Sequence, residues 1–134
     1  MKAQVSVEYL VILGVSFLIL IPFFLYGNQS MVAARDNLRV SMVKNAVEKI
    51  GQSADWVYSQ GSPAKVTVMV YIPEQVEAVS IHNHEINFRV RTTAGVTDVF
   101  YITKGNVSGN IPNSQGYYNV FVVANDSLVW IGVS

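Results

Sequence analysis

The sequence predicts an α+β protein in which one long N-terminal helix packs on a C-terminal domain of antiparallel strands. Three observations lead to this fold class. Residues 9–34 contain no Asp, Glu, Lys or Arg, and residues 43–57 repeat apolar side chains at helical spacing. After Pro63 the chain changes to short runs in which apolar and polar residues alternate, as they do in strands with one buried face.

The helix begins with an apolar run that is long enough to cross a membrane. Its core, residues 9–26, is close to the roughly 20 residues that a helix needs to span a hydrocarbon layer. Glu8 stands at the edge of this run, where an ionised carboxylate is costly and therefore indicates a functional position. No small-residue cleavage site follows Tyr26, so we expect the run to be retained rather than removed as a secretory signal. Lys2 and the initial amine precede the run, which favours a cytoplasmic N-terminus and an exported C-terminus.

The second half of the helix carries apolar side chains on one face. They are Val43, Ala46, Val47, Ile50, Ala54 and Val57. The pattern ends near Gly61 and Pro63, which stop a helix. Pro22 and Gly27 interrupt the first half and predict a kink or a locally loosened turn, with a simple bend as the alternative.

Strands are expected wherever short β-patterned runs lie between turn residues. These runs are Lys65–Ile72, Glu77–His82, Ile86–Thr92, Thr97–Thr103, Tyr117–Ala124 and Ser127–Val133. Asn83 and the pair Asn125-Asp126 indicate tight turns. Gly105–Gly116 contains glycine and proline, and we expect a surface loop there.

The composition argues against enzymes and nucleic-acid-binding proteins. Nine basic residues balance nine acidic ones, so no basic patch for nucleic acid is expected. Cysteine is absent, which rules out disulfides, thiol chemistry and thiolate metal sites. No phosphate-binding glycine loop or catalytic serine motif occurs, and we expect neither catalysis nor a cofactor. His82, His84 and Glu85 cluster near a turn, where solvent exposure is the interpretation that we favour over a metal site.

The residues before the apolar run form a recognisable motif. Lys2 and Ala3 precede Gln4, and Ser6 and Glu8 follow at alternate positions before Tyr9-Leu10. This start resembles the class III signal peptide of archaeal type IV pilins, although the resemblance covers residues 2–10 only. It implies cleavage by a prepilin peptidase between Ala3 and Gln4.

The resemblance also implies an organisation and a function. Residues 1–3 would be a leader peptide, residues 4–60 the hydrophobic-then-amphipathic helix, and residues 61–134 a β-rich head. The processed chain would leave the cell membrane and polymerise through its helix into an extracellular filament of identical subunits, used for adhesion or cell contact. A pilus assembly platform protein and an ATPase are implied partners, while nucleic acid is not.

Filament formation would use two groups of residues in the apolar helix. Glu8 would pair with the new α-amine of Gln4 on a neighbouring subunit and so set the register, whereas exposure of Glu8 to lipid headgroups is the simpler alternative. The filament core would be packed by Leu10, Leu13, Gly14, Phe17, Leu18, Ile21 and Phe24.

Other interpretations remain open. The chain could instead be a monomeric single-span surface protein whose head binds a ligand, or a minor pilin that primes the filament. Sequons at Asn106 and Asn125 lie in expected exported loops and are candidate glycosylation sites, unlike the sequon at Asn28 beside the apolar run. We expect the aromatic residues of the head to lie in its core or at an interface. They are Tyr101, Tyr117, Tyr118, Phe121 and Trp130.

Overall fold

The computed structural model describes residues 2–133 and confirms the α+β layout, in which a long N-terminal helix packs against sheets that are antiparallel except for one parallel pair. This layout is consistent with a type IV pilin-like fold. The elements are α1 (Lys2–Gln60), β1 (Lys65–Ile72), β2 (Val76–His82), β3 (Glu85–Thr92), β4 (Gly95–Ile102), β5 (Val107–Gly109), β6 (Gly116–Ala124) and β7 (Val129–Val133).

The chain divides into two compact units, and the division falls inside α1. Residues up to Arg35 form the first unit, and residues from Asp36 onward form the second. We call these units the stem and the head. The stem is helical through both Pro22 and Gly27, and the predicted kink at these residues stays a prediction.

In the head, the second half of α1 buries the apolar face that the sequence predicts. All six apolar positions between Val43 and Val57 are buried, which confirms the helical spacing. The helix ends at Gln60, and Gly61 follows with a positive φ of 80°. The N–H group of Gly61 donates to the carbonyl of Val57 at 2.9 Å, a common way to end a helix at glycine.

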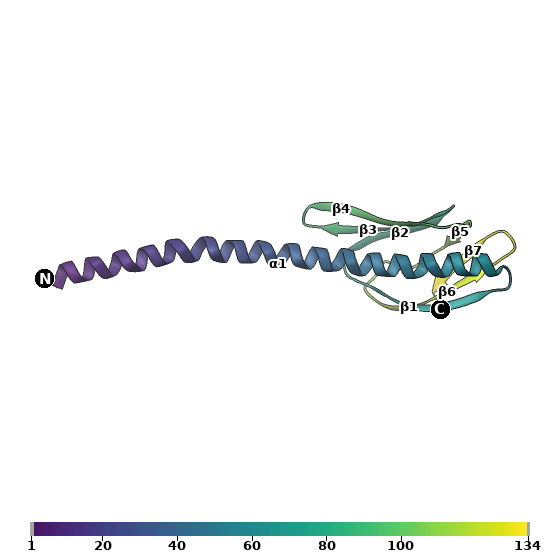
Figure 1. The fold of residues 1–134 in the computed structure, drawn as a ribbon, viewed down its shortest axis with the longest axis horizontal. Helices are drawn as coiled ribbons and strands as arrows, with labels where there is room; N and C mark the ends of the chain where they lie inside the picture. The colour runs from purple at the N-terminus through teal and green to yellow at the C-terminus, as the bar shows by residue number, and fades with distance from the viewer. Residues whose placement is uncertain (1, 134) are drawn as a thin grey trace. The chain divides into compact units, whose positions relative to one another are not determined.

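Two sheets pack on this half of α1. One contains four strands in the order β1-β6-β7-β5, and the other contains three in the order β2-β3-β4 (Figure 1). Alternate residues of each strand turn inward, and their large side chains form one core with the helix. Among the core residues, Phe88, Ile86, Ile131 and Ile72 are fully buried.

The strand predictions are confirmed except in one region. The six expected strands form within one or two residues of their predicted bounds. The prediction of an irregular loop throughout residues 105–116 is wrong, because Val107–Gly109 forms β5, which pairs in parallel with β7. A strand of three residues is too short to show an alternating pattern. Parallel strands are not joined by a hairpin turn, so no turn signal next to β5 indicates its pairing with β7. Burial of Val107 and Ile111 explains why this stretch packs instead of forming a free loop.

Two carboxylates of α1 attach the helix at the two ends of β4. Asp36 accepts hydrogen bonds from the N–H group of Thr93 at 3.1 Å and from its hydroxyl at 2.5 Å. Asp55 accepts from the Tyr101 hydroxyl and from the N–H group of Lys104, both at 2.8 Å. We call these contacts the two carboxylate clips. Because a carboxylate acceptor makes these bonds stronger than neutral ones, they hold the helix along β4.

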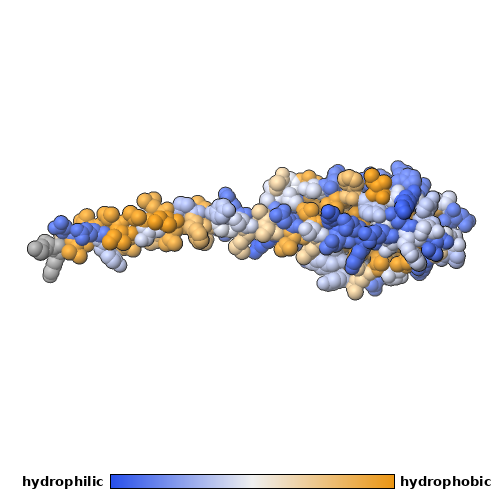
Figure 2. Space-filling model, viewed as in Figure 1, coloured by the Kyte–Doolittle hydropathy of each residue, from blue (hydrophilic) through white to orange (hydrophobic). Residues whose placement is uncertain are grey.

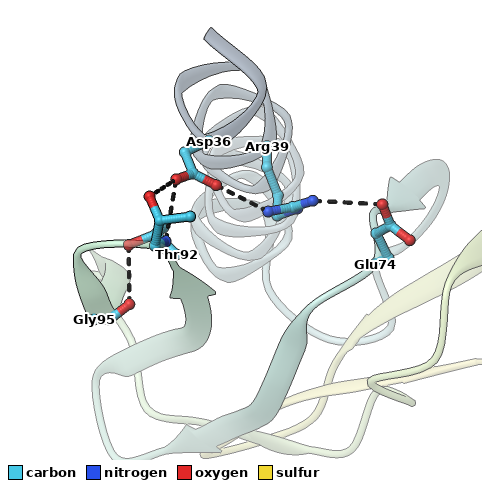
Figure 3. Close-up of polar contacts among 6 residues, drawn as sticks. Asp36, Arg39, Glu74, Thr92 and Gly95 are labelled. Carbon is cyan, nitrogen blue, oxygen red and sulfur yellow. Dashed lines mark hydrogen bonds and ion pairs between the residues drawn. The ribbon is translucent and has the colours of Figure 1, made fainter. Parts of the chain in front are cut away.

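An arginine extends the first clip across the helix. Arg39 pairs with Asp36 at 3.1 Å and reaches Glu74 at 3.4 Å, so it joins the helix to the segment between β1 and β2 (Figure 3). The hydrogen bonds from Thr93, with the hydroxyl first, lower the pKa of Asp36 below its ordinary value, and the nearby Arg39 acts in the same direction. At the second clip, the hydrogen bond to Asp55 raises the pKa of the Tyr101 hydroxyl, because ionisation would remove the donated proton; partial burial and the negative charge of Asp55 act in the same direction.

Gly51 provides the close approach between α1 and β4. A Cβ atom at this position would overlap the ring of Tyr101, so the ring lies directly on the helix backbone. We expect Gly51→Ala to lower the thermal midpoint of the head, because overpacking of this kind costs about 1–3 kcal/mol. Thermal unfolding of the full chain in detergent micelles, followed by circular dichroism, measures the effect.

Gly14→Ala is the matched control for this prediction, because a Cβ at Gly14 would meet nothing within 4 Å. Alanine favours a helix interior over glycine by about 1 kcal/mol, so propensity alone would stabilise both variants. A Gly51→Ala variant as stable as the control would contradict the close packing of Tyr101 on α1.

The first clip predicts a loss of stability in acid. Since the pKa of Asp36 is lower in the folded state, its contribution is present above the ordinary pKa of 3.8 and is lost as the pH falls through the lower, folded value. We expect the thermal midpoint of Asp36→Asn to lie below that of the wild type near neutral pH, and the two midpoints to converge in acid. Thr93→Val should reproduce part of the difference and add little to Asp36→Asn. A difference that stays constant with pH would show that Asp36 acts by another route.

Candidate functional site

The apolar surface of the stem is the most unusual feature of the molecule. Large side chains between Tyr9 and Tyr26 are 37% to 76% exposed, and the most apolar 18-residue window of α1 has none of its residues buried. Figure 2 shows hydrophobic side chains gathered along the N-terminal part of the helix, whereas hydrophobic and hydrophilic patches are mixed on the head. Each such side chain forgoes about 1.5–3 kcal/mol while it remains in water, so the stem requires apolar surroundings.

The residues predicted to pack a filament core lie on this surface. Leu10, Leu18 and Phe24 are more than 60% exposed, and Leu13 is the least exposed of the set at 37%. Nothing lies within 4 Å of where a Cβ would stand at Gly14. The structure places Phe17 and Ile21 on the same exposed rod, so the predicted set is available for contact with lipid or protein.

Within the stem, most backbone groups and the hydroxyl of Ser16 find hydrogen-bond partners in the helix itself. A continuous helix pairs its own backbone groups, which is a condition for entering a membrane. The Ser16 hydroxyl donates to the carbonyl of Ile12 at 2.9 Å and therefore brings no unpaired donor into apolar surroundings. By length and composition the stem can cross a membrane and anchor the chain there.

Glu8 is the charged group at the start of this apolar surface. It is exposed, and within the described side chains it takes part in no salt bridge. Gln4 precedes it by one helical turn and is also exposed, so the two lie on one face of α1. Ala3 belongs to the same helix, whereas Met1 and the side chain of Lys2 lie outside the described part of the leader.

Both candidate glycosylation sites in the head are exposed. Asn106 precedes β5 and Asn125 follows β6. The carbonyl of Asn106 accepts from Val129, and the N–H group of Asn125 donates to Leu128. The two sequons therefore lie near the start of β7 with their side-chain amides open to solvent.

The histidines near the β2–β3 turn do not assemble a recognisable metal site. His82 and His84 are exposed, and Asn83 between them takes the positive φ of 54° that the predicted turn requires. Within residues 2–133, no group of three or more His, Cys, Asp or Glu side chains is positioned to hold a metal ion.

The aromatic residues of the head divide between its core and its outer surface. Tyr101 and Tyr118 are half-buried and pack against the core, whereas Tyr117 and Trp130 are exposed. Tyr117 and Tyr118 thus point to opposite faces of β6, as neighbours on a strand do. Tyr71 is half-buried on the same outer face as Tyr117 and was missed from the sequence, because its cross-strand partner Tyr117 is remote along the chain.

Comparison of the chain with protein-family models, with curated proteins and with solved structures found no match. The chemistry of the site therefore follows from its residues. These are an exposed apolar rod, a carboxylate at its start, and a folded β-rich head whose own core is complete.

Proposed function

We propose that this chain is the structural subunit of an archaeal type IV pilus-like extracellular filament. The observation that carries the proposal is the stem, an apolar helix with no burial of its own and one carboxylate at its start. A folded head on such a stem is what a subunit needs if it is first held in a membrane and then packed among copies of itself. The start around Gln4 and Glu8, which resembles a pilin leader, supports the same function.

The energetics of the stem favour direct transfer from membrane to filament. Moving its exposed apolar side chains into water would cost tens of kcal/mol at about 25 cal/mol per Å². A bundle of identical stems removes the same area from water as lipid does. Small residues such as Gly14 allow neighbouring helices to approach closely, and the larger residues around it supply the contact area.

Glu8 would make this packing specific. A carboxylate moved into an apolar bundle is strongly unfavourable unless it finds a partner of opposite charge. Cleavage between Ala3 and Gln4 creates such a partner, the new α-amine of Gln4. A neighbouring stem seated in the wrong axial position would leave Glu8 unpaired, so the pair selects one register.

The proposal assigns the chain a sequence of partners. A prepilin peptidase removes residues 1–3, and a platform protein with an ATPase extracts the processed stem from the cell membrane. A minor pilin that primes the filament would follow the same route. A monomeric surface protein anchored by the stem would need none of these partners and is the alternative to be tested.

The first test is the mass of the mature N-terminus. We expect mass spectrometry of the membrane-associated protein to find Gln4 as the first residue when the chain is expressed with an archaeal prepilin peptidase. Substitution of Ala3 by a bulky residue, as in Ala3→Trp, should leave the leader attached. An untrimmed protein that remains monomeric in detergent would favour the anchored alternative.

A second test concerns Glu8. We expect Glu8→Val to remain in the membrane and to be cleaved, but to reduce sheared surface filaments at least tenfold, because the register pair is lost. Glu8→Gln has nearly the same size without the charge and should show the same defect. Electron microscopy and quantification of sheared filaments give the result, and wild-type filament yield in both variants would remove Glu8 from the assembly mechanism.

A further inference from the structure

The outer surface of the four-stranded sheet carries four aromatic side chains, of which Tyr117 and Trp130 are exposed and Tyr71 and Phe121 are half-buried. Tyr71 lies on β1, Tyr117 and Phe121 lie on β6, and Trp130 lies on β7. Their strand neighbours turn inward and are mostly buried, so these four side chains share the face directed away from the core. We call this set the aromatic face. Tyr117 is 74% exposed and Trp130 is 46% exposed, which is unusual for residues of this size.

Neighbouring side chains fix the orientation of Tyr71 and Tyr117 on the aromatic face. Tyr71 and Tyr117 are directly cross-strand, with ring centroids 4.8 Å apart and planes tilted by 49°. The side-chain amide of Gln115 donates to the Tyr71 hydroxyl at 3.0 Å. This pair therefore keeps a defined orientation while Tyr117 remains open to solvent, and such preorganisation lowers the entropy cost of binding.

Gly132 allows the rings of Phe121 and Trp130 to lie close to the backbone of β7. It lies opposite Phe121 in the register of β6 and β7. A Cβ at Gly132 would stand 2.8 Å from Cζ of Phe121 and 3.3 Å from Nε1 of Trp130, so both rings approach the bare backbone there. The Lys65 ammonium lies 5.5 Å from the centroid of the Phe121 ring, a distance typical of a cation–π contact.

The remaining side chains on this surface carry little charge, and they include the apolar residues Met69, which is 59% exposed, and Val123. Thr67 and Asn119 lie between the rings, and Lys65 is the one ionised side chain that β1, β6 and β7 contribute to this face. A single-stranded nucleic acid would also stack on exposed rings, but it requires a positively charged groove along its phosphates. The face has no such groove, and the chain has no net charge. The charge pattern therefore favours a neutral ligand.

We propose that the aromatic face binds a neutral polysaccharide. A sugar ring presents a surface rich in C–H bonds that stacks on an aromatic ring, while its hydroxyls hydrogen-bond to amides and hydroxyls beside that ring. Tyr117 and Phe121 lie four residues apart on one strand, about 13 Å at 3.3 Å per residue, so the face spans several linked sugars. Asn119 stands between them with an amide that can both donate and accept. This proposal does not depend on filament formation.

The test uses the full chain in detergent micelles with two named probes, chitohexaose and cellohexaose. The protein contains two tryptophans, so Trp56→Phe leaves Trp130 as the sole tryptophan reporter. We expect titration with at least one probe to shift and quench the Trp130 fluorescence to saturation. Addition of Tyr117→Ala to this background should weaken binding at least tenfold.

Phe100→Ala is the matched control. Phe100 is 59% exposed on β4, in the other sheet, and is therefore an aromatic residue of similar exposure away from the proposed face. Circular dichroism confirms that each variant is folded. A second variant, Asn119→Ala, tests the polar contact without removing a ring and should weaken binding as well.

Three results would overturn the proposal. The first is the absence of saturable binding by either probe, and the second is an equal loss of binding in Phe100→Ala. The third is a change in sedimentation of Tyr117→Ala that shows loss of self-association without any change in sugar binding, which would make the face a contact between copies of the chain.

Discussion

The structure depends on one interaction, the burial of the apolar face of α1 between the two sheets of the head. Without this helix, the inner side chains of both sheets would be exposed to water. The amphipathic half of the helix would not be stable alone, because most helical stability in proteins comes from tertiary packing. The carboxylate clips at Asp36 and Asp55 set how far along β4 the helix lies, and the Gly51–Tyr101 contact sets how close it lies. Apolar burial supplies the stabilisation, and the clips supply the position.

The same helix meets a different requirement before Arg35. Its large side chains between Tyr9 and Tyr26 are apolar on every side rather than along one stripe, and all of them are exposed. A helix that is apolar all round is stable in an environment that is apolar all round, such as lipid or a bundle of similar helices. The head has a core of its own, whereas the stem has none, and this asymmetry is the physical basis of our proposal that the chain is an assembling subunit.

The two surfaces that we assign to binding differ in chemistry. Between Tyr9 and Tyr26 the stem offers mostly aliphatic and aromatic side chains, which suits close packing with similar helices. The aromatic face of the head offers braced rings with an amide and a hydroxyl between them, which suits a ligand with alternating apolar and polar edges. The two proposed roles therefore do not compete for the same surface.

The sequence by itself determined the stem, the buried face of α1, the end of the helix at Gly61 and six of the strands. Each of these follows from local periodicity or from residues adjacent along the chain. Only the tertiary structure decided the rest. Strand β5 is too short to show a pattern and pairs with a strand about twenty residues later, and the partner of Asp36 is 57 residues away. The aromatic face joins Tyr71 to Tyr117 across two strands that come together only when the sheet forms. Such contacts depend on which strands become neighbours, and that is decided by the packing of the whole head rather than by any local stretch of residues.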